Sequence, residues 1–226
     1  MSTQLDLQEQ EQLDALKAFW KQYGNLVTWL LILLLAAYAG WNGWNWWQRD
    51  QALKASAMYD ALEVAVLAGD ADKAGRVFTD LKDRYPRTSY AQQGGLAAAK
   101  AQFDKGQADA AKASLNWVAD NAAEDEYRTI ARLRLAGLLL QSKQYDEALK
   151  QLDGAKAPAF EGLVADRRGD VLTAAGKKAE ALAAYQAAWK AMDEKSDYRR
   201  LVDAKLTALG AAPAASAAAA ASGAAQ

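Results

Sequence analysis

The stretch Leu133–Gly154, "LRLAGLLLQSKQYDEALKQLDG", contains the pattern on which the fold depends. Apolar residues recur at helical spacing on both sides of a short polar break, "QSKQ". This pattern is typical of two antiparallel helices joined by a tight turn. Ala148 closely follows the turn, where two such helices approach one another and only a small side chain fits. The stretch therefore predicts a helix–turn–helix unit closed around an alanine.

The same pattern recurs along most of the chain. Three further segments, "GDADKAGRVFTDL", "KGQADAAKASLNWV" and "GKKAEALAAYQAAW", align on an alanine after a polar turn. The intervals between aligned alanines are 37, 37 and 33 residues, and the four alanines are Ala74, Ala111, Ala148 and Ala181. A helical stretch precedes each turn, at roughly 52–68, 89–104, 127–142 and 161–175. The repeats predict an all-α fold of about four helix pairs.

These units resemble the tetratricopeptide repeat family. That family places a small residue twelve positions before the key alanine. Ala99, Ala136 and Gly169 comply, whereas the equivalent residue of the first unit is Leu62. Pro86 follows the first alanine by twelve positions, as the family's unit-ending proline does. The last helical segment, "DYRRLVDAKLTALG", has an apolar side and ends at a glycine, which is typical of a capping helix. The resemblance implies an α-solenoid.

Upstream of the repeats, the 27 residues from Gln22 to Gln48 carry no charge. A helix needs about 20 predominantly apolar residues to cross a bilayer core. Tryptophan and tyrosine prefer the membrane–water interface, where the ring is half apolar and its polar atom meets water. Such residues gather at the two ends of the run, and we expect them to form interfacial belts: Trp20, Tyr23, Trp41, Trp44, Trp46 and Trp47.

The chain therefore divides into four predicted parts. They are a short arm (1–22), a transmembrane helix (23–47), a repeat domain (48–209) and an alanine-rich tail (210–226) that we interpret as disordered. The span has two alternatives. One is a buried helix of a soluble domain, although such helices rarely stay apolar on all faces for this length. The other is a cleaved secretory signal, because "AYA" at residues 37–39 resembles a small-residue cleavage site. The arm is long and acidic, however, whereas the leading region of a signal peptide is short and basic.

The residue inventory restricts the possible chemistry. The chain has no cysteine and no histidine, which excludes disulfides, thiol nucleophiles, imidazole bases and His/Cys metal sites. Residues 49–209 hold 25 basic and 24 acidic side chains, so there is no basic surplus for nucleic acid. "GDVLTAAGKK" fails as a phosphate loop because six residues separate its glycines. The sequence predicts no catalytic group, metal or cofactor.

Binding is the better hypothesis. In a stack of helix pairs the first helix of each unit faces the concave side. Placing the units in register brings seven side chains toward it: Tyr59, Glu63, Lys100, Phe103, Gln141, Asp166 and Asp170. Tyr59 and Phe103 are candidates for contacting apolar groups of a bound peptide, and the alternative is that both belong to the core. For Asp166 and Asp170 we expect a solvated or partner-contacting face.

The whole arrangement resembles the YfgM-type ancillary subunits of the bacterial SecYEG translocon. The resemblance rests on the arm "LDALKAFWKQYGN", the span with its tryptophan exit, and "VADRRGDVLTAAGKKAEAL". It implies an inner-membrane protein with a cytoplasmic N-terminus and a periplasmic repeat domain. It further implies association with the translocon and with a membrane-anchored periplasmic chaperone of the peptidyl-prolyl isomerase type, assisting unfolded exported proteins.

Charge alone leaves the membrane orientation open. Lys17 and Lys21 before the span balance Arg49 and Lys54 after it, so the positive-inside rule favours neither side. An envelope scaffold of the same architecture, organising another assembly complex, is the alternative function.

The uncharged run predicts a permanent anchor. Mass analysis of the membrane-extracted protein should find a chain that still carries residues 1–39. Recovery of only a soluble form beginning at Gly40 would show that the segment is a cleaved signal.

Overall fold

The structure, a computed structural model, describes residues 7–211, with side chains from residue 11 onward. Helix α1 (Leu7–Leu67) continues through two compact units, which divide between Gln51 and Ala52. The sequence predicted the repeat domain from residue 48. The predicted tail lies outside the described residues from 212 onward.

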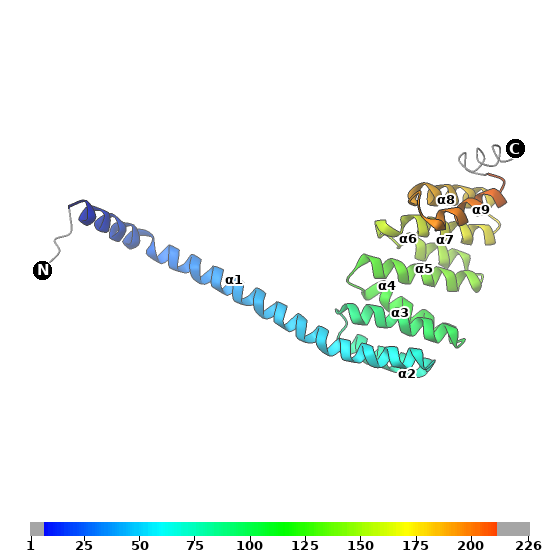
Figure 1. Cartoon of the computed structure of the whole chain (residues 1–226), viewed down its shortest axis with the longest axis horizontal. Coiled ribbons are helices and arrows are strands. Elements are labelled where there is room, and N and C mark those ends of the chain that lie inside the picture. The colour runs from blue at the N-terminus through cyan, green and yellow to red at the C-terminus, as the bar shows by residue number, and fades with distance from the viewer. Residues whose placement is uncertain (1–6, 212–226) are drawn as a thin grey trace. The chain divides into compact units, whose positions relative to one another are not determined.

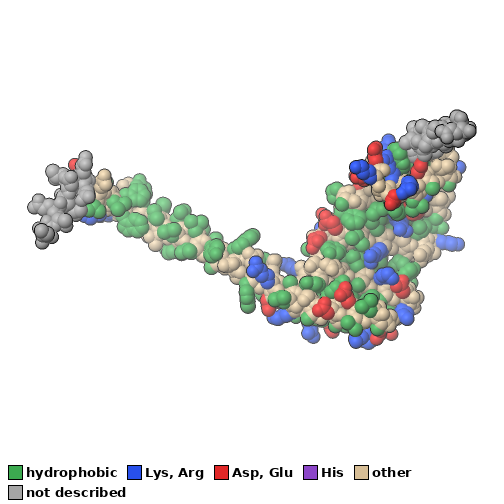
Figure 2. Space-filling view, in the orientation of Figure 1, with side chains coloured by type: hydrophobic (Ala, Val, Ile, Leu, Met, Phe, Trp, Pro, Cys, Tyr) green, Lys and Arg blue, Asp and Glu red, His purple; other side chains and the backbone are tan. Residues whose placement is uncertain are grey.

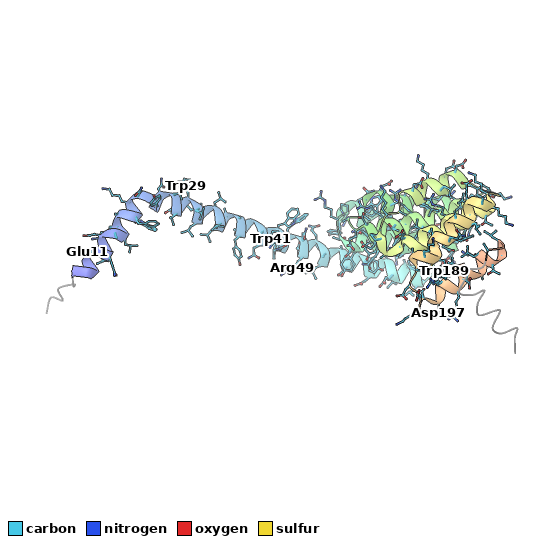
Figure 3. All side chains as sticks on the ribbon, turned by 90° about the horizontal axis from the view of Figure 1, so that it is seen from above. Glu11, Trp29, Trp41, Arg49, Trp189 and Asp197 are labelled. Carbon is cyan, nitrogen blue, oxygen red and sulfur yellow. The ribbon has the colours of Figure 1, made fainter. Side chains whose placement is uncertain are left out.

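The first unit contains the apolar part of α1. Within the described residues, α1 is the one helix long and apolar enough to cross a membrane. Most of its side chains are exposed along the uncharged run; Leu33 and Trp41, for example, are each 70% exposed. Figure 2 shows the hydrophobic side chains along the visible face, and Figure 3 shows Trp29, Trp41 and Arg49 in order along the helix. An apolar surface of this extent needs a covering, and a bilayer provides one.

The second unit is a stack of antiparallel helix pairs. The C-terminal part of α1 pairs with α2 (Ala71–Arg84), as the shared clusters of Ala65 with Ala74 and of Leu62 with Phe78 show. Helix α3 (Ser89–Asp104) pairs with α4 (Ala108–Asn121), and α5 (Asp125–Gln141) with α6 (Tyr145–Asp153). After a 3₁₀ turn, η1 (Pro158–Phe160), α7 (Glu161–Ala174) pairs with α8 (Lys178–Ala191), and α9 (Asp197–Ala208) ends the stack. Figure 1 shows the pairs stacked in chain order. The predicted all-α repeat fold is confirmed.

The four turns share one geometry. A residue with positive φ lies five positions before each aligned alanine: Gly69, Gly106, Lys143 and Gly176, with φ of 68°, 77°, 58° and 77°. In each turn the following amide bonds to the carbonyl five residues back, as from Gln144 N to Leu139 O at 2.8 Å. This bond ends the first helix. The alanine amide then bonds to the first residue after the turn, as from Ala148 N to Gln144 O at 3.0 Å, and the second helix begins.

The aligned alanines lie where paired helices touch. All four are 0% exposed. Opposite them the first helices present small residues: a Cβ added at Gly169, for instance, would lie 2.4 Å from the ring of Tyr185. Leu62 departs from this rule in the first unit and is still fully buried. Helix α3, the first helix of the next unit, makes room for it, because a Cβ at Gly94 would lie 3.3 Å from Leu62 Cδ1.

Helix α9 closes the C-terminal end of the stack. Val202 and Leu206 are buried in a cluster with residues of α8. The Arg199 guanidinium lies over the ring of Trp189, 3.8 Å from its centre. Figure 3 marks this end of the domain with Trp189 on α8 and Asp197 at the start of α9. The predicted capping helix is thus present.

The close approach at the aligned alanines can be tested by overpacking. Substituting leucine at Ala148 or Ala181 should lower the free energy of unfolding by about 1–3 kcal/mol, because the paired helices must move apart. Ala187→Leu, at an exposed position of α8, is the matched control and should change stability by less than about 0.5 kcal/mol. Chemical denaturation measures both. An unchanged midpoint for Ala181→Leu would contradict the helix register.

Candidate protein-interaction groove

An open groove of about 600 Å³ runs along the first helices of the second, third and fourth units. Most of its lining is apolar. The lining residues are Ala99, Lys100, Phe103 and Asp104 of α3, Leu115 of α4, Ile130, Leu133, Arg134, Gly137, Leu138 and Gln141 of α5, Phe160 of η1, and Leu163 and Arg167 of α7.

The apolar floor of the groove is incompletely covered by the protein itself. Phe103 is 40% exposed and Leu163 is 37% exposed, although both lie in a well-packed domain. Grouped hydrophobic side chains that remain in contact with water mark interaction sites more often than scattered ones do. This surface can bury apolar groups of a partner.

Charged groups stand at the edges of the floor. Lys100 Nζ pairs with Asp104 Oδ2 at 2.6 Å, and both side chains are more than half exposed. Arg134 donates from Nη1 to the carbonyl of Leu96 at 3.0 Å. Partial burial lowers the pKa of the Arg134 guanidinium, which stays charged at neutral pH. Arg167 lies against Gly137, where an added Cβ would be 3.4 Å from its Nη1.

The structure brings three of the predicted residues into this groove: Lys100, Phe103 and Gln141. Tyr59 and Glu63 lie on α1 and do not line it. The Tyr59 ring packs on Tyr90 with the ring centres 5.7 Å apart, beside the buried Ala55 and Leu81. Burial, and then the Glu63 carboxylate, raise the pKa of Tyr59. Tyr59 is therefore half in the core, whereas Phe103 belongs to the groove.

The expectation of a solvated or partner-contacting face at Asp166 and Asp170 is wrong. The Asp166 side chain is 3% exposed, and its two oxygens accept from Lys205 Nζ at 2.8 and 2.9 Å. The same ammonium donates to Asp170 Oδ1 at 2.7 Å. Tyr198 and Tyr185 add hydroxyl donors, to Asp166 and Asp170 respectively, each at 2.8 Å. The two carboxylates hold α9 and α8 against α7.

The cause lies in the position of this pair at the end of the stack. Asp166 lies fifteen residues before its aligned alanine, as Leu96 does in the second unit. Leu96 is buried, and its carbonyl accepts from Arg134 on the next first helix. This register position therefore faces the next unit. In the last unit α9 takes that place, so Asp166 is covered by the cap.

The tyrosines of this cluster have raised pKa values. Burial is the largest cause for both, and the hydrogen bond to Asp166 adds to the shift that brings the pKa of Tyr198 to about 12. A tyrosine hydroxyl that donates a hydrogen bond must be neutral. The contribution of Tyr198 to stability is therefore complete below the ordinary pKa of 10.0 and is lost as the pH rises through about 12.

Sequence reasoning missed Arg134 and Arg167. Both lie fourteen residues before their aligned alanines, Ala148 and Ala181, so they are equivalent positions of consecutive units. Their shared position in the repeat was the sequence signal that could have identified them. It was overlooked because the first two units have no arginine there, and because Asp166 and Asp170 beside Arg167 suggested a solvated face.

The other sequence motifs are structural. Glu124 precedes α5, and Asp125 and Glu126 occupy its first turn, where carboxylates favour the positive end of the helix dipole. "GDVLTAAGKK" spans the end of α7, the turn at Gly176 and the start of α8. Within residues 11–211, no group of histidine, cysteine and acidic side chains is arranged to hold a metal ion.

The aromatic residues predicted for the membrane interfaces are all exposed. Their exposed fractions are 57% for Trp20, 44% for Tyr23, 70% for Trp41, 49% for Trp44, 71% for Trp46 and 43% for Trp47. The rings of Trp44 and Trp47 pack on each other with centres 5.2 Å apart. Rings on the surface of an apolar helix are available to lipid, and their interfacial role stays a prediction.

The fold defines a class: tetratricopeptide-like repeat domains that follow a candidate membrane helix. A family model described as "Tetratricopeptide repeat-like domain" matches residues 17–211. A protein of Neisseria gonorrhoeae named "Ancillary SecYEG translocon subunit" is 34% identical over 90% of this chain and 98% of its own length. Proteins of the same name from Escherichia coli and Haemophilus influenzae are 31% and 29% identical over 80% of this chain, covering 87% and 89% of their lengths.

The chain belongs to the family of ancillary SecYEG translocon subunits built on a tetratricopeptide repeat-like domain. An inner-membrane location fits both this family and the apolar part of α1.

The ion cluster beneath α9 can be tested at Lys205. Lys205→Met leaves Asp166 buried without its cation, which should cost roughly 3 kcal/mol, the lower end of the range for a broken buried pair, because Lys205 is 23% exposed. The loss should be local, so backbone amides of α9 should lose protection from hydrogen exchange while those of α3 keep it. Arg200→Met, which removes an exposed ion pair on the same helix, should have little effect. Equal protection of α9 in Lys205→Met and Arg200→Met would contradict this role.

Proposed function

We propose that this protein is a non-enzymatic, membrane-anchored interaction subunit of the SecYEG translocon that links it to periplasmic chaperones and assists exported proteins. The observation that carries the proposal is the open apolar groove on a repeat domain whose relatives are named ancillary SecYEG translocon subunits. The chain has neither histidine nor cysteine, which favours binding over catalysis.

The proposed orientation places the arm in the cytoplasm and the repeat domain in the periplasm. Helix α1 extends past Arg49 into the first repeat unit, so few residues separate the proposed span from the repeat domain. The tryptophans from Trp41 to Trp47 would lie at the periplasmic interface, and Trp20 and Tyr23 at the cytoplasmic one. Charge does not set this orientation, and the family resemblance is its support.

Anchoring explains how a shallow, open groove can suffice. A binding surface tethered near the exit of a translocon meets emerging chains at high effective concentration, so that weak contacts become productive without a deep pocket. The partners proposed for the groove are translocon subunits, a membrane-anchored periplasmic chaperone of the peptidyl-prolyl isomerase type, and unfolded exported chains.

Site-specific photo-crosslinking in living cells tests the proposed function. A crosslinker at Phe103 should capture translocon subunits, a periplasmic chaperone or exported chains, because that side chain borders the groove. A second probe at Tyr59 tests the first unit. The same crosslinker at Ala187, exposed on α8 and outside the groove, is the control. Equal yields at Phe103 and Ala187, or none from translocon components, would contradict the proposal.

Protease added to spheroplasts tests the orientation. Residues beyond about 50 should be digested from outside while the inner membrane is intact. Protection of the repeat domain would place it in the cytoplasm, and a scaffold for another assembly would then be the better function.

A further inference from the structure

We propose that the groove selects apolar peptide segments that carry acidic side chains, and that Arg134 and Arg167 read the carboxylates. This inference rests on the proposed function and adds to it the chemistry of the bound segment. It depends on three features of the groove: the position of the two guanidinium groups, their lack of an acidic partner, and the surface between them.

The two arginines form a repeating feature. Each lies fourteen residues before an aligned alanine, so successive first helices present a guanidinium from the same register position. Packed helices lie about 8–10 Å apart, and the side chains therefore follow one another at roughly that spacing along the groove. Arg134 is held by its hydrogen bond to the carbonyl of Leu96, and Arg167 lies against Gly137 of α5.

Neither guanidinium is neutralised by the protein. Within residues 11–211, no carboxylate forms an ion pair with Arg134 or Arg167. By contrast, Lys100 in the same groove pairs with Asp104, and Arg168 beside Arg167 pairs with Asp153 at 2.6 Å. The charged lining residues are Lys100, Arg134, Arg167 and Asp104, which leaves the groove with a surplus of two positive charges.

The apolar surface between the arginines restricts which kind of anionic ligand fits the groove. Ile130, Leu133 and Leu163 lie in the lining together with Phe103 and Phe160. A ligand that is only anionic would leave these side chains in water, whereas one that is only apolar would bury guanidinium groups without a partner, at a cost. An apolar peptide that carries acidic residues at intervals satisfies both, and arginine binds a carboxylate with two parallel hydrogen bonds.

Backbone spacing fits the same ligand. A peptide in the polyproline II conformation has three residues per turn and rises about 3.1 Å per residue, so acidic side chains three positions apart lie on the same face about 9 Å apart. That distance is close to the spacing of neighbouring helices. A segment crossing α3, α5 and α7 can therefore place one carboxylate at each arginine while the residues between them contact the apolar floor.

The experiment measures peptide binding to the full-length protein in nanodiscs of neutral lipid. The probe is a fluorescein-labelled peptide of roughly 12 residues, long enough when extended to cross three helices, made of leucine and alanine with two glutamates three positions apart. Its twin has glutamine in place of both glutamates. Fluorescence anisotropy should give the glutamate peptide about tenfold higher affinity, and high salt should reduce this difference because it screens the charges.

Variants at the two arginines test whether these side chains cause the preference for the glutamate peptide. Arg167→Gln should remove most of the preference for glutamate over glutamine while the affinity for the glutamine peptide is kept. Arg134→Gln is the second variant and should act in the same direction. Arg168→Gln is the matched control, one residue away on α7 and outside the groove lining, and it should keep the full preference. Circular dichroism checks that each variant is folded.

Equal binding of the two peptides, no binding of either, or an unchanged preference in both arginine variants would overturn the proposal. Displacement of the glutamate peptide by vesicles of anionic phosphatidylglycerol would assign the guanidinium groups to a lipid headgroup instead, and would also overturn it. Crosslinking of translocon components at Phe103 tests the proposed function separately. If that crosslinking succeeds while the peptides bind equally, the function stands and the carboxylate preference is wrong.

Discussion

The close contact of two helices around an alanine is the constraint on which the rest of the structure depends. Each alanine follows a turn in which the chain reverses within a few residues, and its methyl group is fully buried between the paired helices. The contact repeats four times, and the four helix pairs stack in chain order (Figure 1). The first helices consequently form a continuous row, and the groove is the space along that row.

Departures from the repeat occur where a neighbouring element compensates. Leu62 is larger than the family's small residue, and Gly94 on the next first helix makes room for it. Lys143 takes the left-handed conformation that glycine adopts in the other three turns, and the turn keeps its hydrogen bonds. The buried Asp166 has the ammonium of Lys205 and the hydroxyl of Tyr198 as partners. Leu62 and Asp166 are tolerated because a tertiary contact replaces what the local rule supplied, whereas Lys143 keeps the local hydrogen bonds of its turn.

The groove and the cap differ in whether their basic side chains have acidic partners. Lys205 is enclosed by two carboxylates and stabilises the end of the domain. Arg134 and Arg167 occupy equivalent positions on two first helices and face an apolar floor without an acidic partner among the described residues. The same class of interaction therefore has two roles in one domain. Where it is complete it closes the stack, and where half of it is missing it leaves a surface for a ligand.

The sequence alone determined the repeat period, the four aligned alanines, the helical stretches and the uncharged run, because each depends on local spacing and composition. It also indicated Lys100, Phe103 and Gln141 as residues of the concave side. Only the tertiary structure decided that Asp166 and Asp170 bind the cap and that Arg134 and Arg167 line the groove. The physical reason is that equivalent positions have different neighbours in the middle and at the end of a stack. A register can show which side chains point the same way, but what covers them depends on the helix that packs next.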